Sequence, residues 1–214
     1  MAILDSINIG QPRTIPTKSA KTAKTGIYKE PVPSATLTTQ GIEGDAVMDR
    51  RHHGGVDQAV YVYFSDDYVW WSQELGETVA PGTFGENLTL SSVEGRSVAV
   101  GDRFTIGPVV IEVTSHRTPC NVFALRMGDP KFVRRFHRAG RPGAYCRVIT
   151  PGLIEAGKPV TCQLYAGERI TVSELMSTLD GARDVDPAFL RRALTAPVHY
   201  KMRADFEDRL ARLF

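Results

Sequence analysis

The sequence predicts a mainly β protein with a few peripheral helices, followed by a small helical segment. From Ile3 to about Tyr165, short β-rich runs alternate with Gly, Pro, Asn and Asp, which is typical of β-sandwiches and barrels. Near Glu168 the pattern changes to apolar residues at helical spacing. With 214 residues, 42% of them hydrophobic and 23% charged, the chain can bury a full core in one main domain.

Four runs in the first part have the composition and alternation of β-strands. They are residues 59–64 (AVYVYF), 98–107 (VAVGDRFTIG), 109–115 (VVIEVTS) and 144–150 (AYCRVIT). The second and third run flank Gly107 and Pro108, a pair with turn chemistry, so we expect a hairpin there.

Helices and one long loop are expected between these strands. Residues 66–75 predict a helix capped by Ser65 or Asp66, and residues 129–138 predict a second helix that begins at Asp129-Pro130. Residues 11–33, rich in Pro, Lys and Thr, predict an extended loop that carries polar groups over a pocket.

The last part of the chain predicts three short helices. Its apolar pairs and triplets at helical spacing are Leu175/Leu179, Phe189/Ala193 and Phe206/Leu210/Leu213. Asp186 followed by Pro187 matches an N-cap with proline at the first helical position.

Bulk properties narrow the class of protein. The net charge is +2 and the 26 basic residues are spread along the chain, so a nucleic-acid partner is not indicated. The N-terminus lacks a signal-peptide pattern and no apolar run is long enough to span a bilayer, so a membrane partner is not expected. The three cysteines show no close CxxC spacing, which argues against disulfides and cysteine-bound zinc and favours the cytoplasm.

Cys120 is the leading candidate for chemistry. It follows Pro119 where a predicted strand leaves the sheet, and the nearby Arg117 favours the thiolate, the form that binds soft metals or acts as a nucleophile. A buried, inert cysteine explains the local sequence equally well. Cys146 and Cys162 lie within strand-like patterns, and we interpret both as core or filler residues.

Two glycine-containing clusters carry further candidates. In HHGG, residues 52–55, adjacent histidines point in opposite directions, so at most one of them, His53 for instance, can face a given site. Gly54 and Gly55 allow positive φ or a close backbone approach, and zinc is not predicted because further ligands at suitable spacing are missing. Glu86 and Asn87 suit a general acid and a ligand-orienting amide, or simply a turn at a strand entry.

The charged residues near these clusters each allow two interpretations. Asp45 and Asp49 suit a catalytic pair, but a turn with an ion pair to Arg50 or Arg51 explains them at least as well. Lys18, Lys21, Lys24 and Lys29 could hold a phosphate or belong to a solvated loop. Motifs of nucleotide enzymes and of the GxSxG hydrolases are absent.

Taken in order, the motifs resemble the MOSC family, named for the C-terminal domain of molybdenum cofactor sulfurases, and its YiiM-like branch. They are SINIGQPR, TGIYKEPV, GIEGDAVMD, HHGGVDQAVYVY, FGENL, VGDRFTIG, RTPC and GAYCRVITPGLIEAGKPV, so the match covers nearly the whole chain. The resemblance implies a MOSC β-barrel over residues 1–167 and a small three-helix domain over residues 168–214.

The resemblance also implies a molybdenum cofactor, that is molybdopterin with Mo, and no pyridoxal phosphate. Cys120 matches the cysteine that completes the metal coordination in related enzymes, and Arg117 and Lys29 suit the anionic phosphate or the pterin. His53, Gly54, Gly55, Glu86 and Asn87 fall in family elements placed around the pterin and metal. Where the family often reads Gln-Pro-Arg, this chain has Ser115-His116-Arg117, which leaves the contacts of that glutamine open.

The implied activity is the two-electron reduction of small N-hydroxylated bases such as 6-hydroxylaminopurine, a detoxifying role. No flavin, haem or iron–sulfur motif is present, so a separate flavoprotein reductase is the expected electron donor. Two alternatives remain. A sulfur carrier would hold a cyanide-labile persulfide on Cys120, and a non-catalytic molybdopterin-binding module would copurify with cofactor without turnover. The oligomeric state is open.

Overall fold

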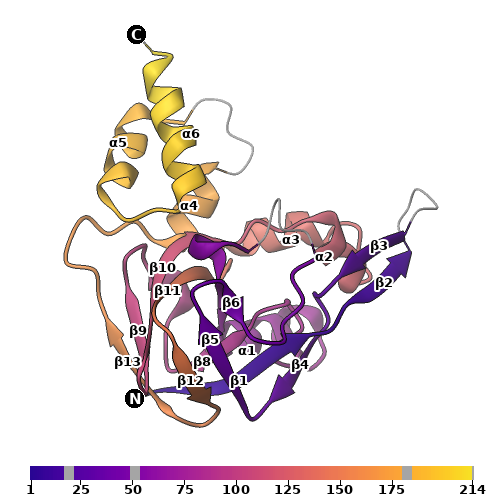
Figure 1. Ribbon diagram of the computed structural model, residues 1–214. Helices are drawn as coiled ribbons and strands as arrows, with labels where there is room; N and C mark the ends of the chain where they lie inside the picture. Colours follow the sequence, from indigo (N-terminus) through magenta and orange to yellow (C-terminus); the bar gives the residue numbers. More distant parts are fainter. Residues whose placement is uncertain (17–21, 49–53, 180–184, 214) are drawn as a thin grey trace.

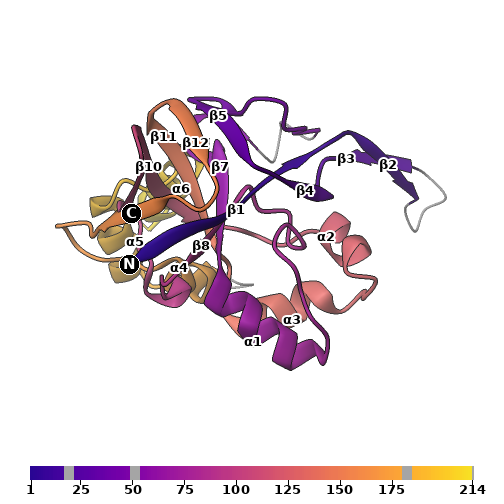
Figure 2. The same cartoon turned by 90° about the horizontal axis from the view of Figure 1, so that it is seen from below.

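The computed structural model describes residues 1–16, 22–48, 54–179 and 185–213 (Figure 1). A closed barrel forms the centre of the molecule, with helices α1 to α3 packed along one side and the last three helices at one end (Figures 1 and 2). The mainly β prediction with peripheral helices and a helical C-terminal part is confirmed.

Seven strands close the barrel. In spatial order they are β13 (Pro159–Gln163), β9 (Arg103–Ile106), β10 (Val109–His116), β11 (Ala144–Thr150), β7 (Val60–Phe64), β8 (Leu88–Ser91) and β1 (Ala2–Gly10). The barrel closes because β1 also pairs with β13, with Ala2 opposite Val160. Neighbouring strands are antiparallel except for the parallel pair β7 and β8.

Alternation along the strands builds two cores. Val60, Val62 and Phe64 of β7 point into the barrel, whereas Tyr61 and Tyr63 point outward into a second, aromatic cluster. This is the period of two that an extended chain imposes on its side chains. The predicted hairpin at Gly107-Pro108 is also confirmed, with Val109 opposite Ile106.

The predicted loop over residues 11–33 contains strands, so that prediction is wrong in part. Arg13–Pro16 (β2) pairs with Thr22–Thr25 (β3), and Lys29–Val32 (β4) extends the barrel sheet beside β1. Three more strands form a small separate sheet: β5 (Ser34–Thr38), β6 (Gly41–Ile42) and β12 (Gly152–Glu155). The run 98–107 forms a strand only over β9, because its first part enters a turn and the short helix η2 (Gly95–Ser97) precedes it.

The predicted helices exist, with different beginnings. α1 (Ser65–Leu75) has Phe64 at its N-cap position with no side-chain cap, because Ser65 Oγ instead donates to Asp5. α3 (Phe132–Ala139) begins three residues after Asp129, whose carboxylate accepts from Lys131 N–H in a preceding turn. The sequence analysis missed α2 (Asn121–Arg126), a six-residue helix directly after Cys120.

A cluster of aromatic rings lies between the barrel and helices α1 to α3. Phe84 is fully buried at its centre, 5.0 Å from Tyr63 and 5.7 Å from Phe123 between ring centroids. Trp71 and Phe136 stack in parallel at 5.8 Å. Edge-to-face and stacked pairs of this kind add to the free energy of burial. This aromatic cluster fixes the helices that follow Cys120.

The C-terminal part contains α4 (Val172–Leu179), α5 (Pro187–Thr195) and α6 (Tyr200–Ala211), as predicted. Asp186 caps α5 by accepting from Ala188 N–H at 2.8 Å, and Phe189, Ala193 and Phe206 share a third buried cluster. α4 also contributes side chains to the barrel core and to the aromatic cluster. The domain boundary at residue 167/168 stays a prediction.

Candidate functional site

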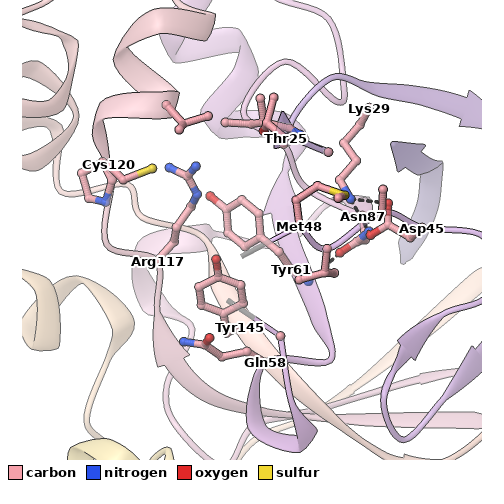
Figure 3. A pocket seen from close by; sticks show the side chains of 18 of the residues that line it. Thr25, Lys29, Asp45, Met48, Gln58, Tyr61, Asn87, Arg117, Cys120 and Tyr145 are labelled. Carbon is pink, nitrogen blue, oxygen red and sulfur yellow. Dashed lines mark hydrogen bonds and ion pairs between the residues drawn. The ribbon is translucent and has the colours of Figure 1, made fainter. Parts of the chain in front are cut away.

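A cavity of about 570 Å³ opens beside the barrel where three segments meet. They are the β3–β4 connection with Gly26, residues 45–48 after β6, and the segment that joins β10 to α2 and carries Cys120 (Figure 3). Side chains on the outward faces of β7 and β11 form the floor. The volume is in the usual range for a small-molecule site.

Gly26 is required for two of these segments to meet. A Cβ atom at Gly26 would overlap the carbonyl oxygen of Ala46, so only glycine fits. The prediction that residues 11–33 carry polar groups over a pocket is confirmed, since Lys24, Thr25 and Lys29 line the cavity.

Arg117 is a buried cation at the cavity wall, with 4% of its surface exposed. Its guanidinium lies 4.1 Å from the Phe123 ring centroid and 5.4 Å from that of Tyr61. Its Nη1 has no hydrogen-bond partner, and no carboxylate among the described residues pairs with it. A buried charge without an ionic partner is costly, so this side chain is suited to an anionic ligand.

Cys120 lines the same cavity and is partly exposed. Arg117 and Cys120 both interact electrostatically with the phenol of Tyr145, and Arg117 also forms a hydrogen bond with it. The three groups are therefore neighbours (Figure 3). Burial raises the pKa of Tyr145 and that of Tyr61, more strongly than Arg117 lowers them. Both phenols therefore stay protonated at neutral pH and remain hydrogen-bond donors.

The other two cysteines lie elsewhere. Cys146 is buried in the barrel core, where burial raises the pKa of its thiol, so its prediction as a core residue is confirmed. Cys162 lies exposed on β13, so a core position is wrong for it; it shares the side of the strand with buried Val160, but lies nearer the end of β13, where residues 161–163 are exposed.

Lys29 is neutralised by Asp45 rather than left available. Its ammonium is buried, with 6% of the side chain exposed, and bonds both carboxylate oxygens of Asp45. Asp45 also accepts from Gly10 N–H at 2.7 Å and from the side-chain amide of Asn87 at 2.9 Å. Burial lowers the pKa of Lys29 while Asp45 raises it. The pair closes one end of the cavity (Figure 3).

Asn87 and Glu86 point to opposite sides of the chain. Asn87 lines the cavity, and its Oδ1 accepts from Tyr61 N–H at 3.1 Å. Glu86 does not line it; its carboxylate accepts from Tyr68 Oη at 2.7 Å and Thr89 Oγ1 at 2.9 Å, and from Gly82 N–H. Glu86 therefore holds α1 and the loop before β8 together, and its catalytic role stays a prediction without a contact in this cavity.

The remaining predicted residues divide as follows. Gly54 lines the cavity with a φ of 78°, and Gly55 has a φ of 87° but lies outside the lining. Outside the described residues lie His53, Asp49, Arg50, Arg51, Lys18 and Lys21. Within the described residues, Asp45 pairs with Lys29. Neutral His116, whose pKa burial lowers to about 4, lies beside Arg117 and has no partner at Nδ1.

Glu86 predicts a measurable pH dependence of stability. Burial raises the pKa of its carboxyl above the ordinary 4.5, so the folded state binds this proton more tightly than the unfolded state. Its contribution is complete below pH 4.5 and is lost as the pH rises through the folded-state pKa. We expect Glu86→Gln to reduce the fall in unfolding free energy between pH 4.5 and 7 in urea denaturation. If the unfolding free energy fell equally with pH in wild type and variant, this account would be contradicted.

In the described part of the chain, three or more His, Cys, Asp and Glu side chains nowhere gather as they would around a metal ion. From these residues the cavity offers one thiol, of Cys120, to a soft metal. No helix within the same residues has the length and apolar character needed to cross a bilayer.

Comparison with known proteins settles the family. The MOSC domain profile matches residues 49–161, which is the stretch that contributes β7 to β11 and Cys120. The chain belongs to the MOSC domain family. This MOSC chain is 35% identical to YflK of Bacillus subtilis over 153 residues, 71% of this chain and 69% of that protein. It is 32% identical to YiiM of Escherichia coli, over 65% of this chain and 68% of that protein.

Solved structures show the same fold. The crystal structure of YiiM from Geobacillus stearothermophilus superposes with a TM-score of 0.79 at 27% identity, covering 98% of this chain and all of that one. YiiM from Escherichia coli superposes with a TM-score of 0.77 at 23% identity, which supports the fold. This is a YiiM-like MOSC protein, in a family associated with molybdenum cofactor enzymes.

Proposed function

We propose that the cavity binds the molybdenum cofactor, with the Cys120 thiolate as the protein's ligand to the metal, and that the protein reduces small N-hydroxylated compounds such as 6-hydroxylaminopurine. The observation that carries the proposal is the buried guanidinium of Arg117 next to Cys120 in one cavity, with no partner at Nη1 and no carboxylate partner among the described residues. A single soft ligand and a fixed cation are what a metal held by a dithiolene and an anionic pterin phosphate require from the protein.

The donor set of the cavity fits this cofactor. Arg117 Nη1 would gain a partner on binding an anion, and Lys24 offers a second, exposed cation at the rim. Asn87 and Lys29 are both paired with Asp45, so we assign them to shaping the cavity rather than to neutralising phosphate. Tyr61 and Tyr145 form a neutral, protonated wall of the cavity, in which the Tyr61 hydroxyl donates to the carbonyl of Pro142 at 2.8 Å.

The proposed reaction balances with two electrons and two protons: R–NH–OH + 2e⁻ + 2H⁺ gives R–NH₂ + H₂O. When bound, the cofactor supplies a centre that accepts oxygen and cycles between states two electrons apart. The protein would contribute the thiolate of Cys120 and the orienting charge of Arg117. The electrons come from outside, and we propose a separate flavoprotein reductase as the donor.

One comparison supports a redox role. The chain is 33% identical over 140 residues to a protein of Gibberella moniliformis named "Reductase", and the match covers 25% of that longer protein. A MOSC segment of this kind therefore occurs within a protein named for reduction.

The direct test is turnover with a chemical electron donor. Cofactor-loaded protein with reduced methyl viologen should convert 6-hydroxylaminopurine to adenine, and cofactor-free protein should not. The conversion is measured by chromatography of substrate and product. Loaded protein that consumes neither viologen nor substrate would refute the proposed reduction. In that case, cyanide-labile sulfur on Cys120 would favour the sulfur-carrier function, and its absence the non-catalytic binding module.

Arg117 gives a second test that does not depend on activity. Arg117→Lys keeps the charge but loses the planar fork held between aromatic rings, so we expect cofactor affinity to fall about 10- to 100-fold. The measurement is titration of apo-protein with extracted cofactor. Arg126→Lys is the matched control, because Arg126 stacks on Tyr28 outside the cavity lining. Unchanged cofactor affinity in Arg117→Lys would contradict the proposal that the Arg117 guanidinium binds the cofactor.

A further inference from the structure

A second cavity, of about 470 Å³, borders the same aromatic cluster as the Cys120 cavity and shares no lining residue with it. Trp70 and Trp71 of α1 form one wall, α3 forms the other, and η2 contributes Arg96. Figure 2 shows α1 and α3 side by side at this face. We call this surface the α1–α3 groove.

The α1–α3 groove is strongly basic. Arg96, Arg135, Arg138 and Arg141 line it against a single acidic residue, Glu74. Residues 131–141, which include α3, carry five Lys or Arg and no Asp or Glu. Asp67 neutralises Arg141, and Arg135 is 3.6 Å from Glu74 and 3.5 Å from Asp129. Arg96 and Arg138 are exposed and make no ion pair with the described residues. Two arginines are thus available to an acidic partner.

The groove is connected to the Cys120 cavity by rings in contact. Trp71 lines the groove and stacks on Phe136, whose centroid is 5.8 Å away. Phe136 is 5.0 Å from Phe123, and the Arg117 guanidinium lies 4.1 Å over the Phe123 ring. Arg117 lines the first cavity together with Cys120. Because electron transfer slows steeply as the gap between groups widens, a path of packed rings is a favourable route between the two cavities.

We propose that the α1–α3 groove is the docking surface for an acidic electron-transfer protein, which delivers electrons through the aromatic cluster to the Cys120 cavity. The proposal rests on the proposed function, because the need for outside electrons gives this surface a partner. Charge complementarity selects the acidic surface, and the ring path explains why docking occurs here rather than on the C-terminal helices. The donor is oxidised by one electron per transfer, and two transfers balance each reduced substrate.

The test uses flavodoxin, a small acidic flavoprotein, as the probe. Binding of oxidised flavodoxin to the full-length protein is measured by calorimetry at several ionic strengths. We expect wild-type binding to weaken as salt rises, and the double variant Arg96→Glu/Arg138→Glu to bind at least about tenfold more weakly. Both residues are exposed, so the variant should fold normally. Arg191→Glu reverses one exposed arginine on α5, against two in the groove, and as the control for a charge reversal elsewhere it should bind like wild type.

Turnover separates this proposal from the proposed function. With reduced flavodoxin the double variant should be slower than wild type, whereas with reduced methyl viologen the two should be equal. If wild type shows no turnover with reduced methyl viologen, the proposed reductase function fails. The docking proposal is still tested, because the binding measurement does not depend on turnover. Docking is overturned if wild type does not bind flavodoxin, if the double variant binds equally well, or if only Arg191→Glu loses binding. A double variant that changes only self-association, seen by light scattering, would also overturn it.

Discussion

Replacing Cys120 by alanine should abolish reduction of N-hydroxylated substrate while leaving the fold intact. The thiol of Cys120 is the one thiol that the described residues bring to the cavity, so its loss removes the proposed attachment of the metal to the protein. We expect turnover with reduced methyl viologen to fall to the level of cofactor-free protein. The side chain is partly exposed and at the edge of the aromatic cluster, so the melting temperature should change little.

The matched control is Cys146→Ala. Cys146 is fully buried in the barrel, so its truncation should cost stability through lost packing but leave turnover per folded molecule unchanged. Wild-type turnover by Cys120→Ala would show that the reaction does not need this thiolate. An equal loss of turnover per folded molecule in both variants would point to a general effect of losing a cysteine.

Replacing Phe84 by alanine should produce the largest loss of stability. Phe84 is fully buried and packs against six rings, with centroid distances from 5.0 Å to Tyr63 to 6.1 Å to Phe132. Truncation of a buried phenylalanine costs about 3–5 kcal/mol, because the ring's contacts are lost and a cavity remains. That is a large share of the roughly 5–15 kcal/mol that stabilises an ordinary domain. Urea denaturation gives the value directly.

A surface leucine supplies the comparison for Phe84. Leu153 of β12 is 56% exposed, so Leu153→Ala should change the unfolding free energy by no more than about 0.5 kcal/mol. A loss below about 1 kcal/mol for Phe84→Ala would mean that the aromatic cluster can collapse around the missing ring. Such a cluster would not hold the Arg117 guanidinium in one position.

The strands were predictable because one local rule determines them. The alternation in residues 59–64 and 144–150 places one face of each strand in the barrel and the other outside, and the structure follows it. α2 was missed because NVFALR is too short for a helical period to show and has no polar cap. The β2–β3 hairpin was missed because its strands are mostly polar and only four residues long.

The site was predictable only where neighbours in sequence are neighbours in space. Arg117 and Cys120 lie three positions apart, and both line the cavity. The Lys29–Asp45 pair joins residues 16 positions apart and could not be seen from local sequence, which offered only Arg50 and Arg51, outside the described residues, as partners of Asp45. Glu86 and Asn87 were treated as one pair, although adjacent residues of an extended chain face opposite sides. The same alternation, applied to AVYVYF and AYCRVIT, would have placed Tyr61 and Tyr145 on the outward face of the barrel, where the cavity lies, but would not have distinguished them from Tyr63.

The most direct test of the central claim is the molybdenum content of purified protein from a host that makes the cofactor. Elemental analysis, with pterin fluorescence after oxidation, should find nearly one molybdenum per chain in wild type and in Cys146→Ala, and little in Cys120→Ala. Wild-type protein that lacks molybdenum and pterin, or a Cys120→Ala variant that retains both in full, would contradict the assignment of Cys120 as the metal ligand.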